Sequence, residues 1–212
     1  MQNNHFFEKH FKLVFLCLYA LLLLFIWRYW PYISDDSLIS FRYVQRFVSG
    51  HGLTWSSGSP VEGYSNLLWI ICLLVPAWFG LNLVWSAQIL GLIFCLATLW
   101  QIMCFARRYV DALYAGFSGL LYTSNITVVL WATGGLEQPL LGFLLTLGLC
   151  RITDFLANEH HCNASLWQSS WPWGLLCWVR PDMPFLVAVF ALFLGFSHSN
   201  RDVKSAFILM IK

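Results

Sequence analysis

The sequence contains very little charge. Lys and Arg number 12 and Asp and Glu number 10, so charged residues make up 10% of the 212-residue chain, whereas a soluble globular domain carries about 25%. No charged side chain occurs in residues 63–106 or 112–136. A chain of this size has too few polar residues to cover both runs in water. The composition therefore argues against a soluble enzyme, a secreted disulfide scaffold, a disordered tail and a nucleic-acid-binding protein. With 59% hydrophobic residues, it predicts an all-α polytopic membrane protein.

Patterns of paired cysteines or metal ligands are also missing. The seven cysteines are odd in number, form no CxxC pair and lie mostly in apolar stretches, which is typical of small buried side chains. The six histidines do not have the spacing of a metal site. We therefore expect neither a disulfide framework nor a zinc site.

The N-terminal apolar run, residues 13–27, follows two lysines and so has features of a signal peptide. No small residues that would permit cleavage follow it. Instead the chain continues with the bulky cluster Arg28-Tyr-Trp-Pro-Tyr32, which is typical of an aromatic belt at a membrane interface. We interpret the segment as an uncleaved first span over residues 11–30.

Further apolar stretches approach the length of about 20 residues that a helix needs to cross a bilayer. They predict spans over 84–106, 112–131 and 137–152. The stretch 171–197 is interrupted by Arg180-Pro181-Asp182, and because proline ends a helix we expect two half-spans that meet at a turn. Residues 203–212 begin another apolar run that stops with the chain. We therefore expect an incomplete span there and a chain that continues further in its relatives.

The positive charges predict the orientation. The segment 67–81 is short and contains Pro76, so we expect it to lie in the membrane interface. Residues 31–83 then form one outer loop with interfacial helices, and the N-terminus is cytoplasmic. This arrangement gathers most of the basic residues on the cytoplasmic side, namely Lys9, Lys12, Arg107, Arg108, Arg151, Arg201 and Lys204.

Two acidic residues, Asp35 and Asp36, follow the first span on the outer side. Ser34 and these carboxylates suit the start of a helix, where Ser34 would cap it and the helix dipole would favour the negative charges. Arg42 and Arg46 follow on a shared stripe of that helix, so capping plus surface charge is one interpretation. The other is a functional carboxylate pair, which could act as a general base or hold a divalent cation through hard oxygen ligands.

Two more polar groups map to the outer side. The Gly-, Ser- and Pro-rich loop 55–66 carries the hydrogen-bonding residues Glu62, Tyr64 and Asn66, and ordinary loop polarity would also explain them. Later loops carry Glu137 and the Arg180-Pro181-Asp182 turn.

Each later group also has a simple explanation, because Glu137 could cap a helix and Arg180 could pair with Asp182. Charged groups from three loops that converge at one membrane face nevertheless indicate a site for an anionic lipid headgroup. The arginine would meet the phosphate, and the carboxylates would handle a metal or a proton.

Four motifs together resemble one family of bacterial membrane glycosyltransferases with the GT-C fold, a family that takes in the terminal arabinofuranosyltransferase of mycobacterial cell-wall synthesis and related Legionella proteins. Their order and approximate spacing match across nearly the whole chain. The motifs are DDSLISFRYVQRFVSGHGLTW at 35–55, GSPVEGYSNLLW at 58–69, ATGGLEQPL at 132–140 and WVRPDMP at 178–184.

The resemblance implies a GT-C type N-terminal transmembrane module in the bacterial inner membrane, with its site on the periplasmic face. It implies transfer of a sugar, with inversion, from a polyprenyl-phosphate donor to a hydroxyl of an envelope glycan or lipid. The partners would be that donor, that acceptor and the lipid bilayer, with no nucleic acid. A divalent cation (Mg, Mn or Ca) would be the cofactor.

The resemblance also implies roles for individual residues. Asp35 and Asp36 match the catalytic acids, one of them the base that deprotonates the acceptor hydroxyl. Glu137 matches an acid that binds acceptor or metal, and with the aspartates it would form the metal site. The residues that would bind the donor phosphate or sugar are Arg42, Glu62, Tyr64, Asn66, Arg180 and Asp182.

The chain departs from the family pattern at residues 57–60, where Ser-Gly-Ser-Pro stands in place of an acid-containing segment. Family members also continue with more spans. One alternative is therefore a catalytically incomplete N-terminal fragment of such an enzyme. A second is a small-solute transporter, but a transporter would be expected to carry its polar residues at mid-membrane on broken helices.

Overall fold

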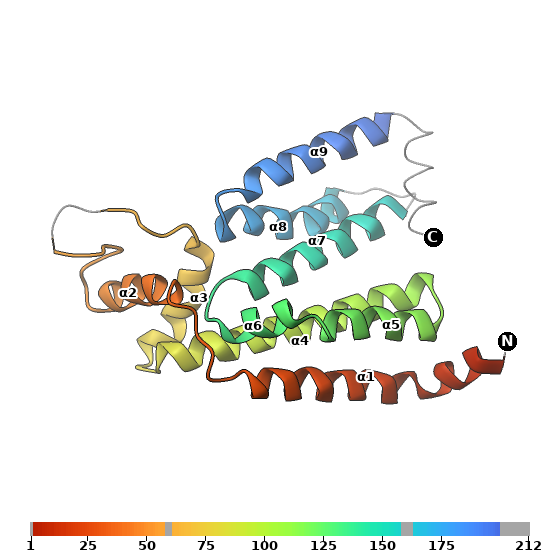
Figure 1. The fold of residues 1–212 in the computed structure, drawn as a ribbon. Helices are drawn as coiled ribbons and strands as arrows, with labels where there is room; N and C mark the ends of the chain where they lie inside the picture. The colour runs from red at the N-terminus through yellow and green to blue at the C-terminus, as the bar shows by residue number, and fades with distance from the viewer. Residues whose placement is uncertain (1, 58–60, 158–162, 200–212) are drawn as a thin grey trace.

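The computed structural model describes residues 2–57, 61–157 and 163–199, and within these ranges it is helical and contains no strand (Figure 1). The predicted all-α class is confirmed for this part of the chain. The helices are α1 (Gln2–Arg28), α2 (Ser37–Val48), α3 (Leu67–Trp78), α4 (Leu83–Tyr109), α5 (Ala112–Thr123), α6 (Ile126–Thr133), α7 (Gln138–Ala157), α8 (Asn163–Val179) and α9 (Met183–Ser199).

Two of the described helices combine the length and the hydropathy of a membrane span: the His10–Arg28 part of α1, and α4. At about 1.5 Å per residue, the 27 residues of α4 reach about 40 Å, more than the ~30 Å hydrocarbon core of a bilayer. Helices α5 and α6 make a third candidate if they are counted as one bent span. The protein is therefore a membrane protein.

The segment expected to form the span 112–131 is divided by a bend of 55° between α5 and α6. The cause is local, because Asn125 starts a new helix: its Oδ1 accepts a hydrogen bond of 3.0 Å from the backbone N–H of Thr127. An asparagine that caps α6 interrupts the apolar run, which hydropathy alone does not reveal.

Figure 1 shows the long helices lying side by side, with α2 and α3 at the end of the bundle away from the N-terminus. We call this end, where α1 ends and α4 and α7 begin, the distal end. The predicted outer loop 31–83 thus holds two short helices, α2 and α3. Their position in the membrane interface stays a prediction, as does the side of the membrane that the distal end faces.

Helices α8 and α9 form a hairpin that turns at Arg180-Pro181-Asp182, where the backbone N–H of Met183 donates to the Arg180 carbonyl at 3.2 Å. The rings of Trp173 and Phe190 stack across the hairpin with centroids 4.6 Å apart. Helix α8 begins at Asn163, earlier than the expected half-span at 171. The expected partial span 203–212 lies outside the described residues.

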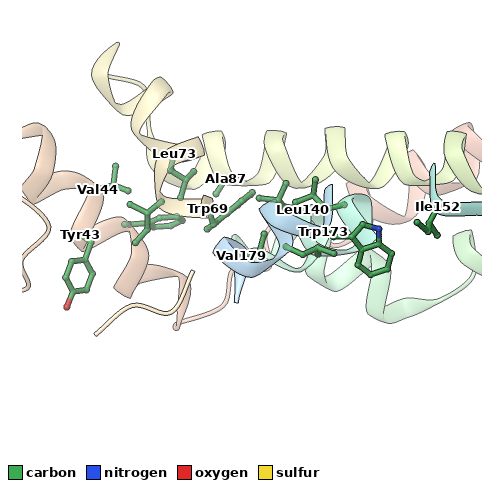
Figure 2. Close-up of a cluster of buried hydrophobic side chains, with 13 residues drawn as sticks. Tyr43, Val44, Trp69, Leu73, Ala87, Leu140, Ile152, Trp173 and Val179 are labelled. Atoms are coloured by element: carbon green, nitrogen blue, oxygen red, sulfur yellow. The ribbon is translucent and has the colours of Figure 1, made fainter. Parts of the chain in front are cut away.

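A cluster of buried side chains attaches α2 and α3 to the bundle (Figure 2). Tyr43 of α2, Trp69 of α3, Leu176 and Val179 of α8 are fully buried, and Leu140 of α7 is nearly so. A second cluster joins α1, α4 and α6. Because close-packed interiors transmit strain and resist displacement, the first cluster holds the loop helices firmly against the helix ends that carry the polar groups.

Helices α4 and α6 approach each other closely at Gly91. A Cβ atom built on Gly91 would overlap the backbone carbonyl of Ala132. We expect Gly91→Ala to lower the free energy of unfolding by about 1–3 kcal/mol, because backbone must shift to make room. Thermal unfolding of the purified protein in detergent measures the effect.

The matched control for this substitution is Gly142→Ala in α7. A Cβ at Gly142 meets nothing within 4 Å, and alanine favours a helix over glycine by about 1 kcal/mol, so the melting temperature should stay equal or rise. Equal melting temperatures for the two variants would contradict the close approach of α4 and α6.

Candidate functional site at the distal end

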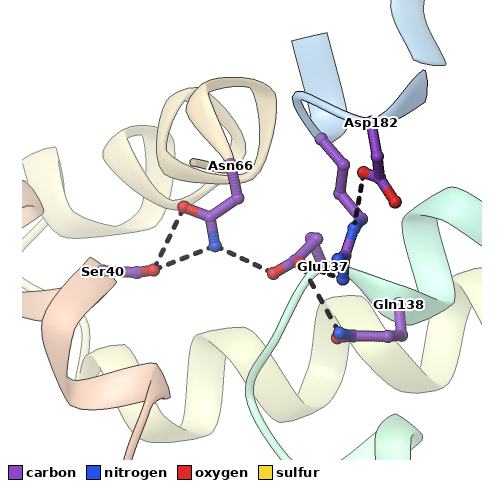
Figure 3. A network of polar contacts seen from close by, with 6 residues as sticks. Ser40, Asn66, Glu137, Gln138 and Asp182 are labelled. Carbon is purple, nitrogen blue, oxygen red and sulfur yellow. Dashed lines mark hydrogen bonds and ion pairs between the residues drawn. The ribbon is translucent and has the colours of Figure 1, made fainter. Parts of the chain in front are cut away.

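Polar side chains from separate parts of the sequence meet at the distal end (Figure 3). The Asn66 amide donates to Ser40 Oγ at 3.0 Å and to Glu137 Oε2 at 2.9 Å. Arg180 donates from Nη1 to Glu137 Oε1 at 3.5 Å and from Nε to Asp182 Oδ1 at 3.0 Å. The network therefore joins α2, the start of α3, the start of α7 and the α8–α9 turn.

Asn66 occupies the N-cap position of α3, but its side chain makes no capping hydrogen bond. Asn82 and Asn125, at the same position of α4 and α6, do accept hydrogen bonds from the backbone of their helices. Asparagine is a favoured N-cap because it satisfies such orphan N–H groups. At Asn66 the Oδ1 atom that could cap the helix accepts from Ser40 Oγ at 3.3 Å instead, and the amide N–H donates to Glu137.

Glu137 is buried, with 7% of its side chain exposed, and a buried carboxylate needs hydrogen-bond partners. Asn66 and Arg180 provide them, together with a weaker contact of 3.4 Å from Gln138 Nε2. Glu137 directly precedes α7, and its carbonyl accepts from Leu141 N–H at 2.9 Å. Its carboxylate, by contrast, is turned into the network.

Hydrogen bonds hold both carbonyl groups of the Gly134-Gly135 turn before Glu137. Ser34 N–H donates to the Gly134 carbonyl at 3.0 Å, and the Trp69 indole N–H donates to the Gly135 carbonyl at 3.0 Å. Gly135 has φ of 81°, a left-handed conformation that glycine adopts without strain. A Cβ there would lie 2.7 Å from Ile33 Cδ1. The position of Glu137 is thus defined by contacts with the loop after α1 and with α3.

The Arg180–Asp182 pair expected as the simple explanation is present, but Arg180 also reaches Glu137. The hydrogen bond from Arg180 lowers the pKa of the exposed Asp182 carboxyl below its usual value. Asp182 therefore stays ionised at neutral pH and holds the Nε side of the guanidinium. Arg180 keeps 38% of its side chain exposed, which leaves it accessible to an anion.

A cavity of about 250 Å³ opens beside this network, and we call it the polar cavity. Among the described residues that line it, Arg180 is the only cationic side chain. The lining residues include Asp36, Ser40, Tyr64, Ser65, Asn66, Glu137, Gln138 and Arg180. The cavity combines two carboxylates, an arginine, amides and hydroxyls, a set able to bind a phosphate and to move a proton.

The two aspartates differ in position. Helix α2 begins at Ser37, so the expectation that both carboxylates lie in its first turn is wrong; Asp36 is the N-cap residue and makes no capping hydrogen bond. Ser34 is not the N-cap residue either, and it contributes its backbone carbonyl, which accepts hydrogen bonds from the N–H and the hydroxyl of Ser37. Asp35 is exposed, accepts from the Asp36 N–H at 3.1 Å, and does not line the polar cavity, whereas Asp36 does.

Other predicted residues lie apart from the polar cavity. Arg42 is exposed, donates to the Trp55 carbonyl at 3.4 Å, and lines a different cavity of about 310 Å³ that includes Asn82. Glu62 is exposed and lines a neighbouring chamber, and Tyr64 lines both that chamber and the polar cavity. The network therefore does not extend to Arg42 or Glu62.

Ser40 and Gln138 line the polar cavity although sequence reasoning did not select them. Ser40 could have been found from its spacing, because residues four apart share a helix face and it follows Asp36 by four. Gln138 directly follows Glu137, and its Oε1 is buried without a hydrogen-bond partner among the described atoms.

The expected cation site does not fit this arrangement. Among the side chains that the structure describes, no group of three or more His, Cys, Asp or Glu residues comes close enough to hold a metal ion. Asp35, Asp36 and Glu137 are thus not gathered as a set of ligands. Glu137 is instead bonded to Asn66 and Arg180, so we derive no step through a metal.

Comparison with known proteins finds one distant relative. The chain is 26% identical over 194 residues to the terminal β-(1→2)-arabinofuranosyltransferase of Mycobacterium tuberculosis, a match that covers 84% of this chain and 27% of the relative. The chain thus spans about a quarter of the length of the curated relative it matches. No family model and no solved structure matches. The similarity supports a membrane glycosyltransferase at a coarse level; the likeness to Legionella proteins stays a prediction.

Proposed function

We propose that this chain forms the catalytic part of a membrane glycosyltransferase, with the polar cavity as its centre. The observation that carries the proposal is that one cavity is lined by Asp36, Asn66, Glu137 and Arg180, which come from four separate connections between helices. The distant similarity to an arabinofuranosyltransferase supports the same class of reaction. The donor would be a polyprenyl-phosphate sugar, and the acceptor a hydroxyl of an envelope glycan or lipid.

Asp36 would act as the base. A hydroxyl is a weak nucleophile, so a carboxylate within reach accelerates attack by accepting its proton. In this step the acceptor oxygen forms a bond to the anomeric carbon, and the bond from that carbon to the phosphate oxygen breaks. The proton passes to Asp36, and the polyprenyl phosphate leaves with the electron pair. Attack opposite the leaving group inverts the anomeric centre, and no covalent enzyme intermediate is needed.

Arg180 would stabilise the leaving phosphate. Its guanidinium has five N–H donors in a fixed fork, of which Nε and Nη1 contact Asp182 and Glu137. The exposed part of the fork is free to meet phosphate oxygens. Glu137, buried and held by Asn66, would orient the guanidinium and accept a hydrogen bond from a sugar hydroxyl. Positioned charges of this kind act where negative charge develops during the reaction.

Sugar transfer by membranes that contain the wild-type chain tests the proposal. Membranes from an expressing host are supplied with a panel of labelled polyprenyl-phosphate sugars, and we expect label from at least one of them to enter a glycan or lipid fraction. Membranes from the same host with an empty vector are the control. Transfer from no member of the panel above that control would contradict the proposed function.

A further inference from the structure

A second chamber adjoins the polar cavity and has a different chemical character. It has a volume of about 480 Å³, within the range of roughly 300–1,000 Å³ of small-molecule sites. Tyr64 and Ser65 line both spaces, so the two are neighbours. Its other lining residues include Glu62, Cys177, Trp178 and Pro181. We call it the aromatic chamber.

The loop wall of the aromatic chamber is fixed by Tyr43, which is fully buried. Its hydroxyl donates to the Val61 carbonyl at 2.8 Å and accepts from the Gly63 N–H at 2.8 Å. Both backbone neighbours of Glu62 are therefore held by one hydroxyl group. A Cβ at Gly63 would lie 2.9 Å from that hydroxyl, so glycine allows the close approach. The Glu62 carboxylate is thus presented from a prearranged loop.

The phenol of Tyr64 is also held in place. Its ring meets the Tyr43 ring edge to face, with centroids 4.8 Å apart. Burial, and then the neighbouring charge of Glu62, raise the pKa of Tyr64 above its usual value, so the hydroxyl keeps its proton at neutral pH. Trp178, near the end of α8, also lines the aromatic chamber and exposes 56% of its surface.

Charge separates the roles of the two spaces. The aromatic chamber carries one carboxylate and no cationic side chain among the described residues that line it, whereas the polar cavity contains Arg180. A phosphate is repelled by the first and attracted by the second. A neutral ligand rich in hydroxyl groups suits the aromatic chamber, because carboxylate and phenol bond to hydroxyls while the C–H face of a sugar ring packs on an aromatic face.

We propose that the aromatic chamber is the subsite for the acceptor saccharide, with Trp178 as the surface on which the sugar ring stacks and Glu62 and Tyr64 as its hydrogen-bonding partners. This inference rests on the proposed transferase function, because only a transferase has an acceptor. It separates the acceptor from the donor phosphate, which belongs beside Arg180. Trp178 lines the same chamber as polar residues of the 61–66 loop. An aromatic residue that served only to contact lipid would not share a cavity with such residues.

Cys177 provides a test that needs no turnover, because it lines the same chamber. A variant that retains Cys177 as its only cysteine is placed in lipid nanodiscs and alkylated with a polar maleimide. The probes are methyl glycosides of pentoses and hexoses, each added in excess. We expect at least one glycoside to slow alkylation. Trp178→Ala should abolish that protection and Trp178→Phe should keep it.

The matched control is Trp171→Ala, which lies two turns earlier on the same face of α8, is partly exposed, and lines neither cavity. It should leave protection unchanged. No protection by any glycoside, or equal protection in Trp178→Ala and wild type, would overturn the inference. Loss of protection in Trp171→Ala as well would also overturn it, since it would indicate a role in seating α8 in the lipid.

Kinetics separate this inference from the proposed function. In the transfer assay, Trp178→Ala should raise KM for the acceptor by about 10-fold, the equivalent of about 1.4 kcal/mol, and leave KM for the donor unchanged. A change in KM for the donor alone would overturn the inference while the transferase function stands. Glycoside protection without any transfer by the wild type would contradict the proposed function and leave the saccharide subsite supported.

Discussion

Replacing Asp36 by Asn is expected to lower the rate of sugar transfer by about 10²–10⁴-fold, which is the usual contribution of a general base. The substitution keeps the size of the side chain and removes only its ability to accept the proton of the acceptor. Initial rates in membranes, normalised to the amount of inserted protein, measure the effect. Folding should be little changed, because Asp36 is exposed and makes no capping hydrogen bond.

The matched control is Asp35→Asn, which removes the same charge from the neighbouring residue. Asp35 is exposed and does not line the polar cavity, so its loss should change the rate by less than about 10-fold, the order expected when a nearby exposed charge is removed and solvent screens it. Equal losses in the two variants would indicate that the pair acts as a shared negative charge. A wild-type rate for Asp36→Asn would show that another group is the base.

Replacing Arg180 by Ala is expected to lower transfer by about 10²–10³-fold, the range found when one donor to a developing charge is removed. The leaving phosphate would lose its cationic partner, and Glu137 would lose one of its hydrogen bonds. Arg180→Lys should recover part of the rate, because it restores the charge without the planar fork. Rates at saturating donor, together with KM for the donor, measure the effect.

Stability must be measured in the same variants. Arg180 is 38% exposed, and screening by solvent limits its pair with the exposed Asp182 to about 1 kcal/mol or less. Its loss also leaves the buried Glu137 carboxylate with one partner fewer, which lowers stability. A melting temperature close to that of the wild type, combined with a large loss of rate, would support a role in binding phosphate. Asp182→Asn is the control, because it keeps Arg180 and removes an exposed partner. A wild-type rate for Arg180→Ala would contradict the proposed phosphate site.

Much of the architecture could be predicted because the bilayer imposes strong rules. Apolar runs of adequate length predicted α1 and α4, and Pro181 between two charged residues predicted the turn between α8 and α9. The bend between α5 and α6 was missed, because it depends on a single asparagine within a run that satisfies the hydropathy requirement. Hydropathy reports the average polarity of a segment, whereas a cap acts through one hydrogen bond.

The candidate site was predictable in its location more than in its contacts. Loops that follow alternate spans share one membrane face, so Glu137 and Arg180 could be expected near the segment after α1. Which of Asp35 and Asp36 lines the cavity depends on where α2 begins, and the spacing of the apolar residues does not fix the first residue of a helix. The hydrogen bond from Arg42 to the Trp55 carbonyl depends on how the loop after α2 folds back onto that helix. The periodicity of apolar residues in the sequence carries no information about that fold.

The partners of Glu137 are synthesised in a particular order, which bears on how the protein is assembled. The chain is made from its N-terminus, so Ser40, Asn66 and Trp69 are present before Glu137, which lies 71 positions after Asn66. Asn66, which donates to the Glu137 carboxylate, is therefore made before it. Arg180, the other partner of Glu137, is made only with the α8–α9 hairpin. All residues that line the polar cavity have therefore been made only once Arg180 has been added, well after the amide that Glu137 contacts.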